Sequence, residues 1–156
     1  MIDGLTAASG KQYSLGKLET GHYQYNGRMY QFDYVPDALQ GALHIMPHAD
    51  DKMMPEGEVC CRFIATCPIW VCVLYPDIQP VLPAWLQEYE RTRLNVTRQD
   101  SDAHTLKGYF SLYRKRFAPG IVTLFGNSPS AMLAADWYVF GFASGYCMYS
   151  ACVVPA

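Results

Sequence analysis

The sequence has few charged residues and no excess of either sign. Asp, Glu, Lys and Arg make up 17% of its 156 residues, against roughly 25% in an average globular domain, and the formal net charge is −2. We therefore expect no basic surface for nucleic acid or an anionic membrane. No apolar run is long enough to span a bilayer, and the N-terminus lacks the pattern of a secretory signal. Provided that Met1 is the native start, these absences predict an intracellular protein of the cytoplasm or cytoskeleton.

The chain also lacks the cysteine spacing of a metal site, although it has six cysteines. Four of them lie in residues 60–75, "CCRFIATCPIWVCVLY", where none makes Cys-x-x-Cys and no histidine is near in sequence. A disulfide framework is not expected in a reducing compartment. Free cysteine behaves as a small buried hydrophobe, and "VCCRFIAT" and "IWVCVLY" each have the composition of a strand. We therefore predict no metal, no cofactor, six unbridged thiols, and an antiparallel pair of strands joined near Pro68.

Short strand-like segments recur along the rest of the chain. They lie at residues 29–36, 41–46, 109–117, 120–125 and 136–142, and they are separated by Gly- and Pro-containing turns. Residues 82–92 form the one helical pattern, because Pro83 suits a first turn and Trp85 and Tyr89 follow at helical spacing. Residues 95–108 are polar and predict a connection. The sequence therefore predicts an all-β, antiparallel, jelly-roll-like β-sandwich with one short helix. We assign residues 1–12 to an N-terminal extension, 13–142 to the sandwich, and 143–156 to a C-terminal strand or tail.

The order of these segments resembles a known module. The segments "YNGRMYQFDYVPDALQGALHIMPHADDK", "VCVLYPD", "LPAWLQEYERT" and "YFSLYRKRFAPGIVTLFGN" look like the galactose-binding-like β-sandwich of polysaccharide-associated and protist proteins. The matching positions are Asp50, Asp51, Lys52, Tyr75, Pro83, Trp85, Leu86, Leu112, Tyr113, Lys115, Phe117, Gly120, Val122, Leu124, Gly126 and Asn127. Ala49 and Phe125 depart from the pattern, as does the turn "YPDIQP". The resemblance implies a module that carries no catalytic site, and it does not specify a ligand.

The segment "HIMPHADDK" holds the best candidate for a ligand loop, formed by His48, Asp50, Asp51 and Lys52. Carboxylates at this spacing suit a hard cation, and the nearby His44 adds a second imidazole. The alternative is structural, because Asp residues in a turn often cap their own backbone N–H groups. We favour the structural role and assign no metal site.

Nothing in the sequence singles out catalytic residues. Ser128 and Ser130 lack the Gly-x-Ser-x-Gly context of an activated serine, and no two of the many carboxylates stand out as a pair for glycoside cleavage. We therefore predict that the protein is not an enzyme.

Aromatic residues are abundant, with 12 Tyr and 3 Trp. Large rings on a chain with few charges are typical of protein interfaces, and we expect Trp137, Tyr146 and Tyr149 to bind a partner. The leading hypothesis is a structural or adaptor subunit of a larger assembly of proteins. Its specific form is a microtubule-associated protein of the axoneme of a cilium or flagellum, with tubulin as the partner. The alternative is a carbohydrate-binding module.

Overall fold

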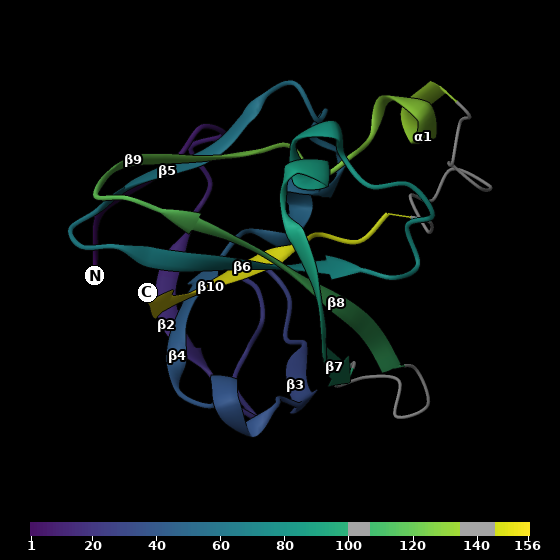
Figure 1. The fold of residues 1–156 in the computed structure, drawn as a ribbon. Coiled ribbons are helices and arrows are strands. Elements are labelled where there is room, and N and C mark those ends of the chain that lie inside the picture. The colour runs from purple at the N-terminus through teal and green to yellow at the C-terminus, as the bar shows by residue number, and fades with distance from the viewer. Residues whose placement is uncertain (100–106, 135–145) are drawn as a thin grey trace.

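The chain forms an all-β antiparallel sandwich, as the sequence predicts. The computed structural model describes residues 1–99, 107–134 and 146–156. Their strands are β1 (Ile2–Ala7), β2 (Ser14–Leu18), β3 (Gln31–Tyr34), β4 (Ala42–Met46), β5 (Val59–Ala65), β6 (Ile69–Pro76), β7 (Glu90–Gln99), β8 (Lys107–Phe117), β9 (Gly120–Phe125) and β10 (Ser150–Pro155). Within the described residues, one sheet has the order β1-β5-β9 and the other the order β2-β4-β10-β6-β8-β7-β3. Figure 1 shows β5 and β9 above β6 and β10, with β2, β3, β4 and β7 below.

The helices of the described segments are short. Three are 3-10 helices, at Asp37–Leu39, Ala49–Met53 and Ala84–Glu88, and α1 (Ser130–Ala134) is a single α-helical turn. None of them has the length and apolar character needed to cross a membrane. The helix predicted over residues 82–92 is shorter than expected and covers Ala84–Glu88 only. It ends at Glu88, because the chain turns at Tyr89 and enters β7 at Glu90.

The cysteine-rich run contributes a strand that is buried on both faces. Val71, Val73 and Tyr75 of β6 face a core between the two sheets, whereas Cys72 and Leu74 face a second core on the other side of the larger sheet. A strand with both faces buried has no polar alternation, which explains the continuous apolar sequence. All six cysteines are free, as predicted.

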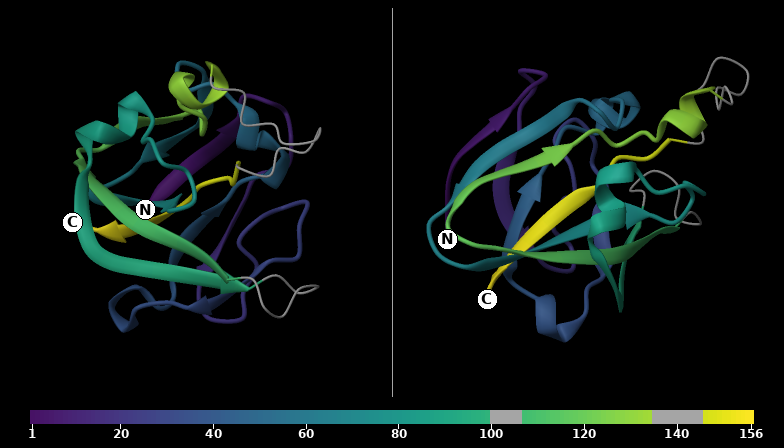
Figure 2. Two further views of the ribbon diagram at one scale, coloured as in Figure 1. Left: turned by 90° about the vertical axis from the view of Figure 1, so that its right-hand side faces the viewer. Right: turned by 45° about the horizontal axis from the view of Figure 1, so that its top comes forward.

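The prediction that the two cysteine-rich strands pair with each other is wrong. β5 pairs with β1 and β9, and β6 pairs with β10 and β8 in the other sheet. The chain crosses from one layer to the other between Ala65 and Ile69 instead of folding back as a hairpin. Figure 2 shows the two layers from other directions, with β10 (yellow) in the layer opposite β9 (light green).

The two edges of the larger sheet meet beneath the second core. Residues after β2 bond to residues at the start of β3, through Gly21 N to Phe32 O at 2.8 Å and Phe32 N to His22 O at 2.9 Å. The sheet thus curls toward closure around Leu18, Phe32, Leu74, Phe110 and Leu112. Closure satisfies backbone groups that an open edge would leave unpaired.

Both ends of the chain are parts of the sheets. We expected residues 1–12 to be an extension, but Ile2–Ala7 form β1, which pairs with β5 in an antiparallel register. Residues 150–155 form β10, which lies between β4 and β6 in the middle of the larger sheet. The sandwich therefore begins at Ile2 and includes the C-terminal strand.

Candidate functional site

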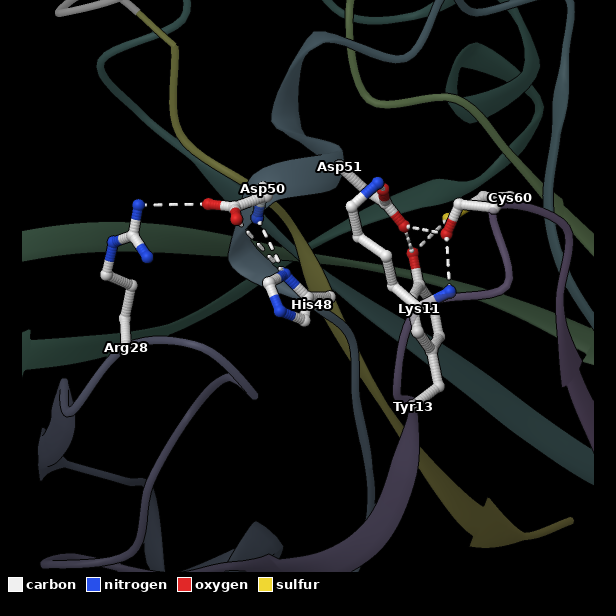
Figure 3. Close-up of polar contacts among 8 residues, drawn as sticks. Lys11, Tyr13, Arg28, His48, Asp50, Asp51 and Cys60 are labelled. Carbon is white, nitrogen blue, oxygen red and sulfur yellow. Dashed lines mark hydrogen bonds and ion pairs between the residues drawn. The ribbon is translucent and has the colours of Figure 1, made fainter.

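The loop predicted as a ligand site is held together by contacts within the protein. His48 Nδ1 accepts a hydrogen bond from Asp50 N at 3.1 Å, so the imidazole caps the 3-10 helix that starts at Ala49. The exposed carboxylate of Asp50 pairs with Arg28 Nη2 at 2.9 Å. Gly27 makes this packing possible, because a Cβ there would lie 2.5 Å from His48 Cε1. Figure 3 shows these contacts on one side of the loop. The Asp residues were expected to cap this turn, but the His48 side chain supplies the cap.

Asp51 is buried on the other side of the same loop. Its Oδ2 accepts hydrogen bonds from Ser9 Oγ and Tyr13 OH, both at 2.7 Å, and Lys11 Nζ lies 3.2 Å from Oδ1. Tyr13 OH also lies 3.1 Å from Cys60 Sγ. Figure 3 shows the two side chains meeting at this contact. Burial, together with the nearby Cys60 and Asp51, raises the pKa of Tyr13. This cluster joins the β1–β2 connection to the loop, and its polar atoms are directed at one another.

Lys52 contributes to a separate, buried network through its backbone. Its carbonyl oxygen accepts hydrogen bonds from Asn127 Nδ2 at 2.9 Å and Ser128 Oγ at 2.6 Å. Asn127 Nδ2 also donates to Cys147 O at 2.8 Å, and Asn127 Oδ1 accepts from Tyr149 N at 2.9 Å. The loop residues that the sequence singled out are thus positioned by structural contacts. The loop also borders a depression of about 340 Å³ that Asp50 and Asp51 help to line. A ligand at this loop stays a prediction.

The aromatic tail does not supply exposed rings. Tyr146 is 5% exposed and Tyr149 is 2% exposed. Tyr149 packs against Trp85 with a ring-centroid distance of 5.4 Å, and its hydroxyl donates to Phe125 O. Both rings are thus buried in the segment that leads into the central strand β10, and a partner contact at Tyr146 and Tyr149 stays a prediction. Trp137 lies outside the described residues.

Exposed tyrosines gather instead on one face of β3, β7 and β8. Tyr34 of β3 pairs with Thr97 of β7, and Thr97 pairs with Tyr109 of β8. Directly paired residues project from the same face of a sheet, which places Tyr109 beside Thr97. Tyr34 pairs with Thr97 from the other side, after a register shift between Phe32 and Tyr34. Tyr34 is 52% exposed and Tyr109 is 55% exposed, whereas Thr97 between them is 9% exposed. We call this surface the tyrosine face.

Polar groups occupy the adjoining positions of the tyrosine face. Asn95 of β7 pairs with Ser111 of β8, one row along from the two tyrosines. Ser111 Oγ donates to Asp77 Oδ1 at 2.7 Å, and Asp77 N donates to the backbone oxygen of Tyr109 at 2.9 Å. The face therefore consists of Tyr34, Asp77, Asn95, Thr97, Tyr109 and Ser111.

A bulge in β7 opens a depression beside these groups. Arg91 pairs with Tyr113 and Asn95 pairs with Ser111, so three residues of β7 lie opposite Leu112 alone. Thr92 stabilises the bulge, because its hydroxyl donates to Leu112 O at 2.9 Å and accepts from Leu94 N at 3.1 Å. The depression has a volume of about 400 Å³ and is lined by Arg91, Thr92, Arg93, Leu94, Asn95 and Ser111. Bulges often redirect side chains beside functional sites.

The sequence did not predict this face. We expected residues 95–108 to be a polar connection, but Asn95–Gln99 belong to β7 and Lys107 begins β8. The signal was weak because the exposed half of β7, "ERTRLN", alternates poorly across the bulge.

The described segments contain no group of three or more His, Cys, Asp or Glu side chains arranged to hold a metal ion. The tyrosine face offers aromatic rings, an amide, hydroxyls and a carboxylate, and the depression beside it adds guanidinium groups. Its chemistry is that of recognition by stacking and hydrogen bonding.

The comparisons with known proteins give one informative match. No protein-family model matches the sequence, and no curated protein matches it. Among solved structures, the chain is similar to a β-glucuronidase from glycoside hydrolase family 2, with a TM-score of 0.73 and 19% sequence identity. The alignment covers 97% of this chain and 14% of the glycosidase. The similarity shows that the two share a β-sandwich fold and that this chain corresponds to about a seventh of the larger protein.

Proposed function

We propose that this β-sandwich is a carbohydrate-binding module whose ligand lies on the tyrosine face. The observation that carries the proposal is the pair of half-exposed rings, Tyr34 and Tyr109, in one row beside Asp77, Asn95 and Ser111. A pyranose ring has an apolar C–H surface that packs on an aromatic ring, and hydroxyl groups that need hydrogen-bond partners at its rim. The tyrosine face offers both on adjacent positions of a rigid sheet.

The fold comparison supports the same class of ligand. The neighbour is, by its name, a β-glucuronidase from glycoside hydrolase family 2, and the aligned part makes up 14% of its chain. Because the chain spans so small a share of that enzyme, the proposal covers binding and does not extend to hydrolysis. The proposed module is not catalytic.

The test is to measure glycan binding by the whole chain and by surface variants. We expect the wild-type chain to bind one class of oligosaccharide on a glycan array, and we expect Tyr34→Ala and Tyr109→Ala each to weaken binding about tenfold in calorimetry, through loss of a stacked ring. Ile121→Ala is the matched control, since Ile121 is 75% exposed on β9 in the other sheet. Binding that neither tyrosine variant weakens would contradict the proposal, as would failure to bind any glycan.

A second candidate function is the adaptor role, and one observation favours it. Ile64 of β5 and Ile121 of β9 lie directly opposite each other on the smaller sheet and are 48% and 75% exposed. An exposed apolar pair is compatible with a protein contact at that face. The Ile121→Ala control separates the two functions, because it should weaken a native complex while leaving glycan binding unchanged. The cytoskeletal identity of the partner, tubulin included, and the location in a cilium or flagellum stay predictions.

A further inference from the structure

The depression at the β7 bulge carries two arginines that form no ion pair with a carboxylate of the described residues. Arg91 and Arg93 both line it and are both exposed. Neither has an ion-pair partner among the described residues. Arg114 of β8, in contrast, is paired with Glu90 through a 3.0 Å contact from Nε to Oε2. The bulge of β7 therefore places two guanidinium groups without ion-pair partners beside one depression.

The surroundings hold one of the two arginines in place. Arg91 Nη2 donates to Ser111 Oγ at 3.4 Å, and its guanidinium carbon lies 6.0 Å from the centre of the Tyr113 ring. Ser111 is 6% exposed, and its own hydroxyl proton is directed at Asp77 Oδ1. The serine hydroxyl thus lies between Arg91 and the carboxylate of Asp77. The remaining N–H groups of Arg91 are available to a ligand.

We propose that the bulge of β7 is a subsite for the carboxylate of an acidic sugar, with Arg91 and Arg93 as its cationic groups. The inference rests on the proposed function and adds a ligand class to it. A planar guanidinium matches a carboxylate through two parallel hydrogen bonds. Asn95 lies between the bulge and the tyrosine row, so a sugar stacked on Tyr109 can present its carboxylate to the arginines and a hydroxyl to the amide. The ligand class is an oligosaccharide that contains uronic acid.

The proposal is tested with three tetrasaccharides and the whole chain. The first is a hyaluronan tetrasaccharide, which alternates glucuronate with N-acetylglucosamine. The second is the same molecule after reduction of its carboxylates to alcohols, and the third is a sulfated chondroitin tetrasaccharide. We expect the first to bind about tenfold more tightly than its reduced form, and to lose affinity as salt is raised. Equal binding of the first two would overturn the inference while leaving the carbohydrate-binding proposal intact.

Variants assign the effect to the bulge. Arg91→Gln and Arg93→Gln should each lower affinity for the hyaluronan tetrasaccharide about tenfold and leave binding of its reduced form unchanged. Arg62→Gln is the matched control, because Arg62 is an exposed arginine on β5 in the other sheet. A preference for acidic sugar that survives both bulge variants would contradict the assignment. The assignment would also be contradicted if the sulfated chondroitin tetrasaccharide bound most tightly and the hyaluronan tetrasaccharide lost no affinity when its carboxylates were reduced. If none of the tetrasaccharides or array glycans binds, the proposed function itself fails.

Discussion

His44 is a fully buried histidine whose two ring nitrogens have no hydrogen-bond partner among the described residues. It packs edge-on against Phe32, with 5.1 Å between the ring centroids, inside the second core. Burial, and to a smaller extent the charge of His22, lowers the pKa of His44 to about 3. A neutral imidazole in an apolar core is tolerated, but an imidazolium there has no compensating partner.

This burial predicts that the protein loses stability in mild acid. The unfolded chain binds a proton at His44 near pH 6.5, whereas the folded chain does not do so until about pH 3. Stability from His44 is thus fully present above pH 6.5 and declines as the pH falls. We expect a loss of about 2–3 kcal/mol between pH 7 and pH 4.5, measured by urea unfolding at each pH.

The variant His44→Leu should make the stability curve flatter over the same range, and it should not destabilise the protein strongly at pH 7, because it removes two unsatisfied nitrogens. His22→Gln isolates the smaller cause: it removes the nearby charge but not the burial of His44, so it should leave most of the pH dependence in place. An unchanged pH dependence in His44→Leu would show that other groups cause the acid sensitivity.

At the scale of elements, the turn after β9 depends on close contact between two backbones. A Cβ on Gly126 would lie 1.8 Å from the carbonyl oxygen of Pro55 and 2.7 Å from that of Met54. The contact is fixed on both sides, because Ser128 N donates to Met54 O and Gly126 N donates to Glu58 O. Neither backbone can move aside without breaking these bonds.

We therefore predict that Gly126→Ala destabilises the protein by about 2–3 kcal/mol, as an overpacked substitution does. The measurement is the free energy of unfolding in urea. Gly57→Ala is the matched control, because a Cβ at Gly57 meets nothing within 4 Å, and it should leave stability nearly unchanged. Similar values for the two variants would mean that the turn adapts more easily than its hydrogen bonds indicate.

The elements differ in how well the sequence predicts them. β6 was predictable because both of its faces are buried, so its sequence is an uninterrupted run of β-branched, aromatic and cysteine residues. The strands that pair with β6 were not predictable, because the three-residue connection between β5 and β6 suits a hairpin and a crossing between layers equally well. β7 was partly missed because the bulge breaks its alternation and its outer residues are exposed.

The candidate site was less predictable than the fold, because it depends on the pairing of strands that are distant in sequence. Tyr34, Thr97 and Tyr109 come from three separate segments, and only the register of β3, β7 and β8 places them in one row. The hydrophobic pattern of a strand determines which face each residue takes, but it does not identify the residue of a distant strand that lies opposite. By contrast, the loop at His48–Lys52 was visible because its polar residues are adjacent in sequence, yet the fold uses them as structural contacts.

At the scale of the whole molecule, the C-terminal strand joins parts of the fold that are distant in sequence. β10 pairs with β4 on one side and with β6 on the other. Its residues serve both cores, since Ala151 and Val153 face the core between the sheets and Cys152 faces the second core. β1, in contrast, is at the edge of the smaller sheet, and Ile2 is its one buried residue.

The position of these two strands predicts different outcomes for truncation at the two ends. Deletion of residues 150–156 leaves β4 and β6 without their common neighbour and exposes both cores, so we expect no cooperative unfolding transition and loss of near-UV circular dichroism. Deletion of residues 1–8 removes an edge strand, and we expect a cooperative transition at a lower urea midpoint. A chain lacking residues 150–156 that still unfolds cooperatively would show that β4 and β6 can pair without β10. In that case the tail would be free to extend toward a partner, as an adaptor requires.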